Sequence, residues 1–240
     1  LRRAKGRFRV NVATRTGILV QEVRGVEIFN PTVPADARAL VDALAEASEI
    51  ATALPSVEFY KQGEPSVASL IAEGIQRKAA RKDLTSAIVY TAENHNHAAE
   101  ILQQLCDDRL DESALGQAPR RVQFLNTVIG KMSGVVTVPE QIKAEGLACL
   151  VEDSPRALLV EEFNRILITH IRLPGFQRGI EAFIEKPDLL PFEEAKLYGH
   201  NAVHALLGYL AARQGCRFMS EAGNDPALMK LARDAFLEES

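Results

Sequence analysis

Four polar side chains of kinds that do acid–base chemistry lie within nine residues of one another: Lys196, His200, Asn201 and His204. On an α-helix they point in directions of about 0°, 40°, 140° and 80°, taking Lys196 as zero. Most of the large apolar residues of the same segment fall on the neighbouring arc. The spacing therefore predicts a helix that packs on one side and presents an amine, an amide and two imidazoles on another.

This set of groups suits the reversible removal of a proton from an alcohol. A lysine beside a desolvated site can be neutral near working pH and act as a general base. The amide of Asn201 can donate to an oxygen as alkoxide character develops, and an imidazole can hold the hydroxyl or orient the lysine. The geometry alone also fits a half-exposed amphipathic helix that carries these residues by chance, so both interpretations stay open at this point.

His200 and His204 also have the i, i+4 spacing of a zinc-binding pair. The HNAVH segment lacks the glutamate that HExxH metalloproteases carry after the first histidine. A zinc hydrolase is therefore an alternative function, and its third ligand has to come from elsewhere in the chain. The candidates for that ligand are Glu161, Glu162, His95 and His97.

The elements that must position such a site alternate between short buried strands and amphipathic helices. Expected strands cover 49–54 and 87–91, and expected helices cover 36–47, 67–80 and 93–106. This alternation is typical of βαβ units with parallel strands and right-handed crossovers. Earlier in the chain, 8–12 and 18–23 alternate apolar and polar residues around a turn, which predicts a hairpin.

Ligands of open parallel sheets bind at the carboxyl ends of the strands. Here those ends are 52–56 and 91–94, which contain Thr52, Pro55 and Asn94. The motif GxGxxG occurs nowhere in the 240 residues, so the expected sheet has neither the glycine-rich phosphate turn nor the first strand before it. We expect the sheet to have an edge where that first strand belongs.

The pattern changes after about residue 115. The β-branched content of 121–129 and 157–168 predicts strands, whereas 191–213 and the segment from 224 onward have the periodicity of helices. A loop near 118 indicates a domain boundary. The sequence thus predicts an α/β fold with a parallel sheet over 1–118, followed by a mostly helical substrate domain over 119–240.

Composition narrows the class of protein. The 240 residues are 47% hydrophobic and 25% charged, as in a globular protein with a sizeable core, and not as in a disordered chain. The net charge of −4 argues against a nucleic-acid partner, although five of the first nine residues are basic. Three dispersed cysteines without CxxC spacing favour a reducing compartment, hence the cytoplasm. No stretch is long and apolar enough to predict a membrane span.

At 191–213 the sequence resembles the polyol-specific long-chain dehydrogenases, the family of mannitol 2-dehydrogenase, mannitol-1-phosphate 5-dehydrogenase and the hexuronate reductases. The family's K-L-x-x-x-N-x-x-H frame stands here as KLYGHNAVH at 196–204. TALPSV at 52–57 and TAEN at 91–94 are similar to the family's cofactor-side strand ends. The resemblance runs in order from about Leu1 to Arg213.

The resemblance implies a Rossmann-like dinucleotide-binding domain and a helical substrate domain. It implies zinc-independent hydride transfer between NAD, or alternatively NADP, and a small-molecule polyol, sugar phosphate or sugar acid. In that reaction Lys196 is the general base, and Asn201 and His204 bind the reacting oxygen. The resemblance also implies cofactor contacts by Thr52, Pro55 and Asn94, and substrate contacts by Asn94, His200 and Lys131.

The sequence departs from the family at one position of the site. The family's V-D-R-I segment stands here as Ile129-Gly130-Lys131-Met132, so Gly130 replaces an acidic residue of the substrate or proton path. Together with the missing glycine-rich turn, this favours a further alternative, a truncated relative that is not catalytic. Three functions therefore remain open: an oxidoreductase, a zinc hydrolase and a non-catalytic relative.

Overall fold

The computed structural model describes residues 4–131, 133–152, 154–162 and 165–239. The chain divides into two compact units between Glu185 and Lys186. Among the described residues, the first unit holds a five-stranded and a four-stranded sheet, and the second is mostly helical. The α/β class expected from the sequence is confirmed. The structural division comes later than the expected boundary near 118, because the strand that follows 118 joins the sheet formed by the earlier strands.

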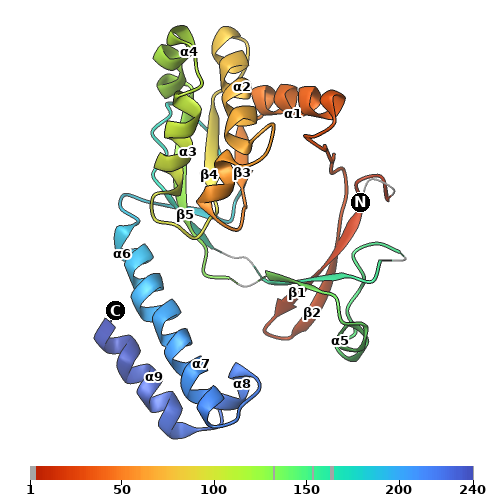
Figure 1. Cartoon of the computed structure of the whole chain (residues 1–240), viewed down its shortest axis with the longest axis vertical. Coiled ribbons are helices and arrows are strands. Elements are labelled where there is room, and N and C mark those ends of the chain that lie inside the picture. Colours follow the sequence, from red (N-terminus) through yellow and green to blue (C-terminus); the bar gives the residue numbers. More distant parts are fainter. Residues whose placement is uncertain (1–3, 132, 153, 163–164, 240) are drawn as a thin grey trace. The chain divides into compact units, whose positions relative to one another are not determined.

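The five-stranded sheet contains the predicted parallel strands (Figure 1). In spatial order its strands are β3 (Glu49–Thr52), β4 (Ala87–Thr91), β5 (Val122–Val128), β8 (Ile166–Thr169) and β9 (Phe183–Lys186). β3, β4 and β5 are parallel, with Ile50 opposite Val89 and Val89 opposite Phe124, which confirms the predicted pairing of the first two. β8 pairs antiparallel with β5. In the described chain β3 lies at one edge of this sheet, as expected.

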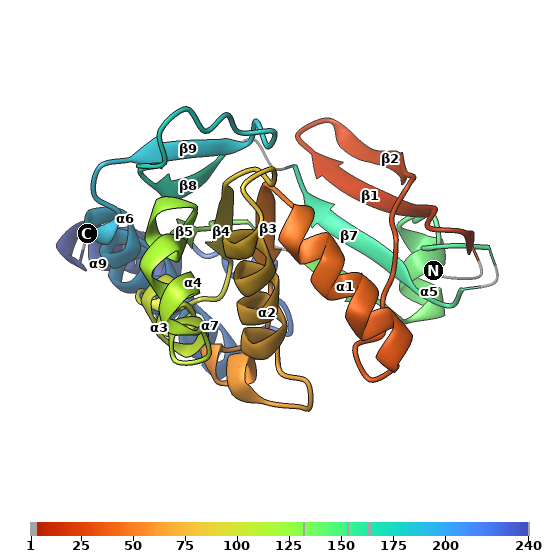
Figure 2. The same ribbon diagram turned by 90° about the horizontal axis from the view of Figure 1, so that it is seen from above.

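Helices cover one face of the parallel strands. They are α1 (Pro34–Glu46), α2 (Val67–Ala80), α3 (Ala98–Asp107) and α4 (Glu112–Gln117), with the 3₁₀ turns η2 (Val57–Lys61) and η3 (Ala118–Arg120). Figure 2 shows α2 and α3 side by side in front of β3, β4 and β5, with α1 beside α2. α1 and α2 approach closely at Gly74, where an added Cβ lies 2.8 Å from the Cβ of Leu44.

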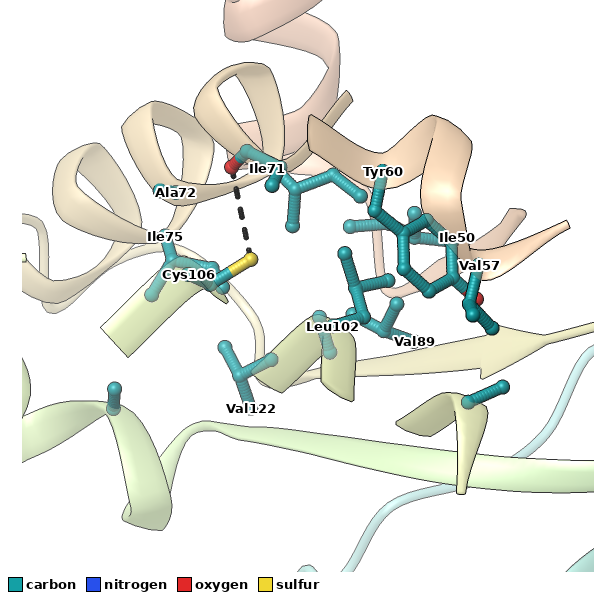
Figure 3. Close-up of a cluster of buried hydrophobic side chains, with 14 residues drawn as sticks. Ile50, Val57, Tyr60, Ile71, Ala72, Ile75, Val89, Leu102, Cys106 and Val122 are labelled. Carbon is teal, nitrogen blue, oxygen red and sulfur yellow. Dashed lines mark hydrogen bonds between the residues drawn. The ribbon is translucent and has the colours of Figure 1, made fainter. Parts of the chain in front are cut away.

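The strand β4 is buried on both faces, which explains why AIVYT is apolar almost throughout. On the helical face, Val89 packs in a cluster with Ile71 and Leu102, shown in Figure 3. On the other face, Tyr90 packs against Phe183, with ring centroids 4.3 Å apart. These two clusters hold the carboxyl ends of the parallel strands at fixed positions.

Two expected elements need correction. The helix expected from Glu93 begins at Ala98, because the residues before it form a turn in which His95 Nδ1 accepts from the His97 amide. The strand expected over 157–168 is two strands, β7 (Ala157–Glu161) and β8, which belong to different sheets. The charged pair Glu161-Glu162 follows the first apolar run, and it was the sign of the break that the expectation overlooked.

The four-stranded sheet has the order β2, β1, β7, β6. Its strands are β1 (Phe8–Thr14), β2 (Gly17–Val23), β6 (Ser133–Val136) and β7, and the helix α5 (Pro139–Ala144) follows β6. β1 and β2 form the predicted antiparallel hairpin. Asn11 is fully buried in β1, and its amide bonds the carbonyls of Ala148 and Leu158, both at 2.9 Å. This amide therefore fixes the 148 loop to the sheet.

The second unit consists of helices over the described residues from 186 onward. They are α6 (Leu190–Glu194), the π-helical segment η4 (Ala195–Asn201), α7 (Ala202–Arg213), α8 (Met219–Ala222) and α9 (Pro226–Glu239). Ala211, Ala222 and Leu228 form the buried centre where α7, α8 and α9 pack together. Within the described chain, no helix combines the length and the apolar character that crossing a bilayer requires.

Candidate active site

The predicted catalytic helix changes its hydrogen-bond pattern in the middle. The α-helical α6 leads into the π-helical segment η4, and α-helix resumes in α7. Lys196 lies near the start of η4 and Asn201 ends it, five residues later. Short π-helical segments are rare and occur frequently at functional sites.

The π-helical segment corrects the directions expected from α-helical periodicity. In an α-helix, residues five apart point about 140° away from each other. In a π-helix the backbone hydrogen bond joins residues five apart, so such residues lie about one turn from each other on the same side. Lys196 and Asn201 stand in this relation. Their amine and amide therefore share a side of the helix more closely than the sequence predicted.

Lys196 has the environment that a lysine base needs. Its side chain is half-buried, and burial lowers the pKa of its amine. An amine must be neutral before it can take a proton, so a lower pKa raises the usable fraction near neutral pH. Asn201 is half-buried as well, whereas His204 is exposed. The helix thus combines a partly desolvated amine and amide with an imidazole open to solvent.

The two histidines of this helix contact each other. The rings of His200 and His204 lie edge to face, with centroids 4.3 Å apart and planes at 72°. Among the residues that the structure describes, no three His, Cys, Asp or Glu side chains gather so as to hold a metal ion.

The predicted cofactor residues lie at the carboxyl ends of β3 and β4. Pro55 and Asn94 are exposed there. Thr52 is buried, and its hydroxyl donates to Oε2 of Glu93 at 2.8 Å while its carbonyl accepts from the Ala92 amide. The polar groups of Thr52 are thus engaged inside the protein, and a direct cofactor contact by this residue stays a prediction.

Glu93 is the residue at this edge that sequence reasoning missed. It is 3% exposed, and it accepts hydrogen bonds from Thr52, from the Leu54 amide and from the hydroxyl of Tyr60. Burial and the neighbouring carboxylate raise the pKa of Tyr60. A carboxylate placed two residues after an apolar strand is a signal that could have drawn attention to it.

The segment that departs from the family follows β5. Gly130 is exposed, and a Cβ added there meets no atom within 4 Å. Lys131, the predicted substrate contact, is half-buried, and Met132 lies outside the described residues. The backbone at 130 therefore has room for a side chain that this sequence does not supply.

The predicted residues fall in different units. Thr52, Pro55, Asn94 and Lys131 belong to the first, and Lys196, His200, Asn201 and His204 to the second. The structure brings the second group together on one helix. The convergence of the two groups on one substrate stays a prediction.

No family model matches the sequence. Curated relatives include the mannitol-1-phosphate 5-dehydrogenase of Lacticaseibacillus casei (strain BL23), 26% identical over 204 residues, which are 85% of this chain and 48% of the relative. The enzyme of the same name from Brevibacillus brevis is 28% identical over 232 residues, which are 96% of this chain and 54% of that protein. The chain thus spans about half the length of these curated relatives.

Two solved structures share the fold. The substrate-free D-sorbitol dehydrogenase has a TM-score of 0.75 at 14% identity, with 94% of this chain and 52% of that one covered. The mannitol 2-dehydrogenase of Pseudomonas fluorescens, in a ternary complex with NAD and D-mannitol, has a TM-score of 0.66 at 18% identity. That match covers 95% of this chain and 51% of the other. The Rossmann-type α/β fold is thereby confirmed.

Proposed function

Because this chain is a relative of the polyol dehydrogenase family, we propose that it serves as an oxidoreductase. It interconverts a polyol, sugar phosphate or sugar acid with the matching keto compound by hydride transfer. The observation that carries the proposal is the π-helical segment, which sets a half-buried Lys196 one turn from Asn201. A cytoplasmic location and a small molecule as the partner, with no nucleic acid, belong to the same proposal.

Lys196 acts as the general base for the substrate hydroxyl. Its Nζ takes the hydroxyl proton during oxidation and returns it during reduction, and the lowered pKa of the amine favours the neutral form that oxidation needs. Asn201 donates its amide hydrogen to the same oxygen, which gains negative charge as the proton leaves. His204 holds that oxygen from the next turn of the helix. His200, in contact with the ring of His204, contacts the substrate and limits the orientations of its neighbour.

NAD is the proposed cofactor, with NADP as the alternative, and when bound it accepts the hydride from the carbinol carbon. The exposed edge of the parallel sheet fits the nucleoside part of such a group. Asn94 offers an amide donor and acceptor there, and Pro55 offers an apolar surface. Thr52 supports this edge from inside through its bond to Glu93. The glycine-rich turn that holds a pyrophosphate is not among the 240 residues. The proposed contacts of Asn94 and Pro55 therefore concern a nucleoside part of the cofactor and not its pyrophosphate.

Lys131 is the proposed substrate contact from the first unit. An ammonium group at the end of a long side chain pairs with a phosphate or a carboxylate as a point charge. Two of the curated relatives carry a phosphorylated substrate in their names. This favours a charged sugar over a neutral one, because a neutral polyol gives the cation no counter-charge.

The test measures binding and turnover on the same protein. NAD and NADP are titrated calorimetrically, and NADH formation is followed with D-mannitol, D-sorbitol and mannitol 1-phosphate. We expect cofactor binding, turnover that K196M removes, and no effect of a chelator. Cofactor binding without turnover, or neither, supports the non-catalytic relative, and chelator-sensitive hydrolysis supports the zinc enzyme. Each of those results contradicts the proposal.

A further inference from the structure

We infer that Glu93 is a positioning residue whose buried carboxylate ties together the two loops that carry Pro55 and Asn94. The inference rests on the proposed function, since those loops form the proposed cofactor edge. Glu93 itself touches no cofactor in this scheme. It acts through the backbone on either side of it.

Three donors from the β3 side converge on the Glu93 carboxylate. Oε2 accepts from the Thr52 hydroxyl at 2.8 Å and from the Tyr60 hydroxyl, and Oε1 accepts from the Leu54 amide at 2.8 Å. Glu93 is 3% exposed and Tyr60 is fully buried. A buried carboxylate is costly unless donors surround it. Here the donors come from the end of a strand, the loop after it and the turn η2.

These bonds extend the connection between the two strands beyond the sheet. Among the described residues, the bond from the Ala92 amide to the Thr52 carbonyl, at 3.0 Å, is the last backbone link between the β3 and β4 ends. Beyond that bond, the Glu93 side chain links to the Leu54 amide. Leu54 directly precedes Pro55, and Glu93 directly precedes Asn94. One side chain therefore sets the separation of the two exposed residues. Without it, both loops lose their fixed point one residue before the proposed contacts.

The opposite end of the same strands provides a matched control. Glu49, at the start of β3, accepts from the Tyr90 hydroxyl and from the Gly179 amide, both at 2.8 Å. Like Glu93 it accepts from a tyrosine hydroxyl and a backbone amide, but its own backbone lies at the amino end of β3, three residues before Thr52. A general loss of stability should follow from E49A as well as from E93A, whereas a loss of loop positioning should follow from E93A alone.

The experiment compares E93A, E93Q and E49A with the original chain by hydrogen–deuterium exchange. We expect E93A to speed exchange of the Leu54 amide by at least about tenfold, since hydrogen bonds to charged groups are the strong ones. Peptides covering 52–62 and 92–97 should also exchange faster in E93A than in the original chain. The exchange rates of E93Q should stay close to those of the original chain, because its Oε1 can accept from the Leu54 amide while its Nε2 donates to the two hydroxyls. E49A should leave both segments unchanged.

A calorimetric titration with NAD separates this inference from the proposed function. We expect E93A to weaken NAD binding about tenfold, because loops that have lost their order must be ordered on binding, and E49A to leave it unchanged. If the original chain does not bind NAD, the proposed function fails, while the exchange data still decide whether Glu93 holds the loops. Equal exchange in E93A and E49A over 52–62 overturns the inference, and so does an E93A variant with the original NAD affinity.

Discussion

Replacing Lys78 with methionine should remove a pH dependence of stability that this lysine creates. Lys78 is 1% exposed at the end of α2, and its Nζ donates to the carbonyls of Ala47 at 2.9 Å and Thr85 at 2.7 Å. Burial, with a smaller contribution from the charge of Arg121, lowers the pKa of its amine from 10.5 to about 8. The bonded carbonyls are neutral, so no carboxylate among these partners compensates the buried charge.

The sign and size of the effect follow from this pKa. The unfolded chain holds the proton more tightly than the folded chain. Below pH 8 the amine is protonated in both states, and there the buried charge lowers the free energy of unfolding. Stability should therefore rise as the pH rises from about 8 toward 10.5, where the folded amine is neutral and the unfolded one is still charged. The whole difference corresponds to roughly 3 kcal/mol, of which about 2 kcal/mol is gained between pH 7 and 9.5.

Other buried groups act in the opposite direction at high pH. Burial raises the pKa of Cys106 to about 12 and raises the pKa values of Tyr60 and Tyr90. These groups stay protonated in the folded chain after they ionise in the unfolded one, so stability is lost as the pH passes about 9 for the thiol and 10 for the phenols. The difference between the original chain and K78M cancels these contributions. That difference is therefore the quantity to measure.

Denaturant unfolding at pH 7 to 9.5 provides the measurement. The chain has no tryptophan, and near-UV circular dichroism of the buried Tyr60 and Tyr90 reports on the first unit. We expect the free energy of unfolding of the original chain, relative to K78M, to rise by about 2 kcal/mol over this range. K82M, which removes an exposed lysine nearby, should keep the original profile. Parallel profiles for the original chain and K78M would refute the reasoning.

Further predictions concern the proposed site and the packing. K196M should lower polyol oxidation at least about 10²-fold and abolish the ascending limb of its pH profile, whereas N201A should lose a comparable factor and keep that limb; initial rates against pH decide between them. G74A should lower the free energy of unfolding by about 1–3 kcal/mol despite alanine's helix propensity, since its Cβ meets Leu44 at 2.8 Å, and an unchanged denaturation midpoint contradicts this. G130D should change stability by less than about 0.5 kcal/mol, because open space surrounds that position, and should raise turnover if the family's acidic group acts there.

The parallel strands could be predicted because their burial on both faces leaves a continuous apolar run. AIVYT at β4 has no polar face, and its pairing with β3 follows from the helix between them. The start of α3 could not be predicted in the same way. The residues just before Ala98 include two asparagines and two histidines, which are weak helix formers. The bonds of Glu93 across the sheet then show that its side chain is used outside the helix. A local pattern does not contain a contact with a loop about forty residues earlier.

The boundary and the break after β7 were missed for a related reason. A run of β-branched residues predicts extended chain but does not say with which strand it pairs. Leu159 pairs with Asn11 in one sheet, and Ile168 pairs with Thr127 in the other. Such partners are separated by very different lengths of chain. Sheet membership, and with it the division into units, is therefore a tertiary property that strand propensity cannot supply.

The π-helical segment changes the expected directions of two predicted site residues. Lys196 and Asn201 were assigned to one reacting oxygen, yet an α-helix turns residues five apart to different sides. A locally wider helix, with a backbone bond from residue i to i+5, brings residues five apart closer to the same side. Segment η4 has that geometry over Ala195–Asn201. The sequence analysis placed Lys196 and Asn201 on an α-helix, so the local backbone geometry between them was not predicted, and their shared role at one oxygen stays a prediction.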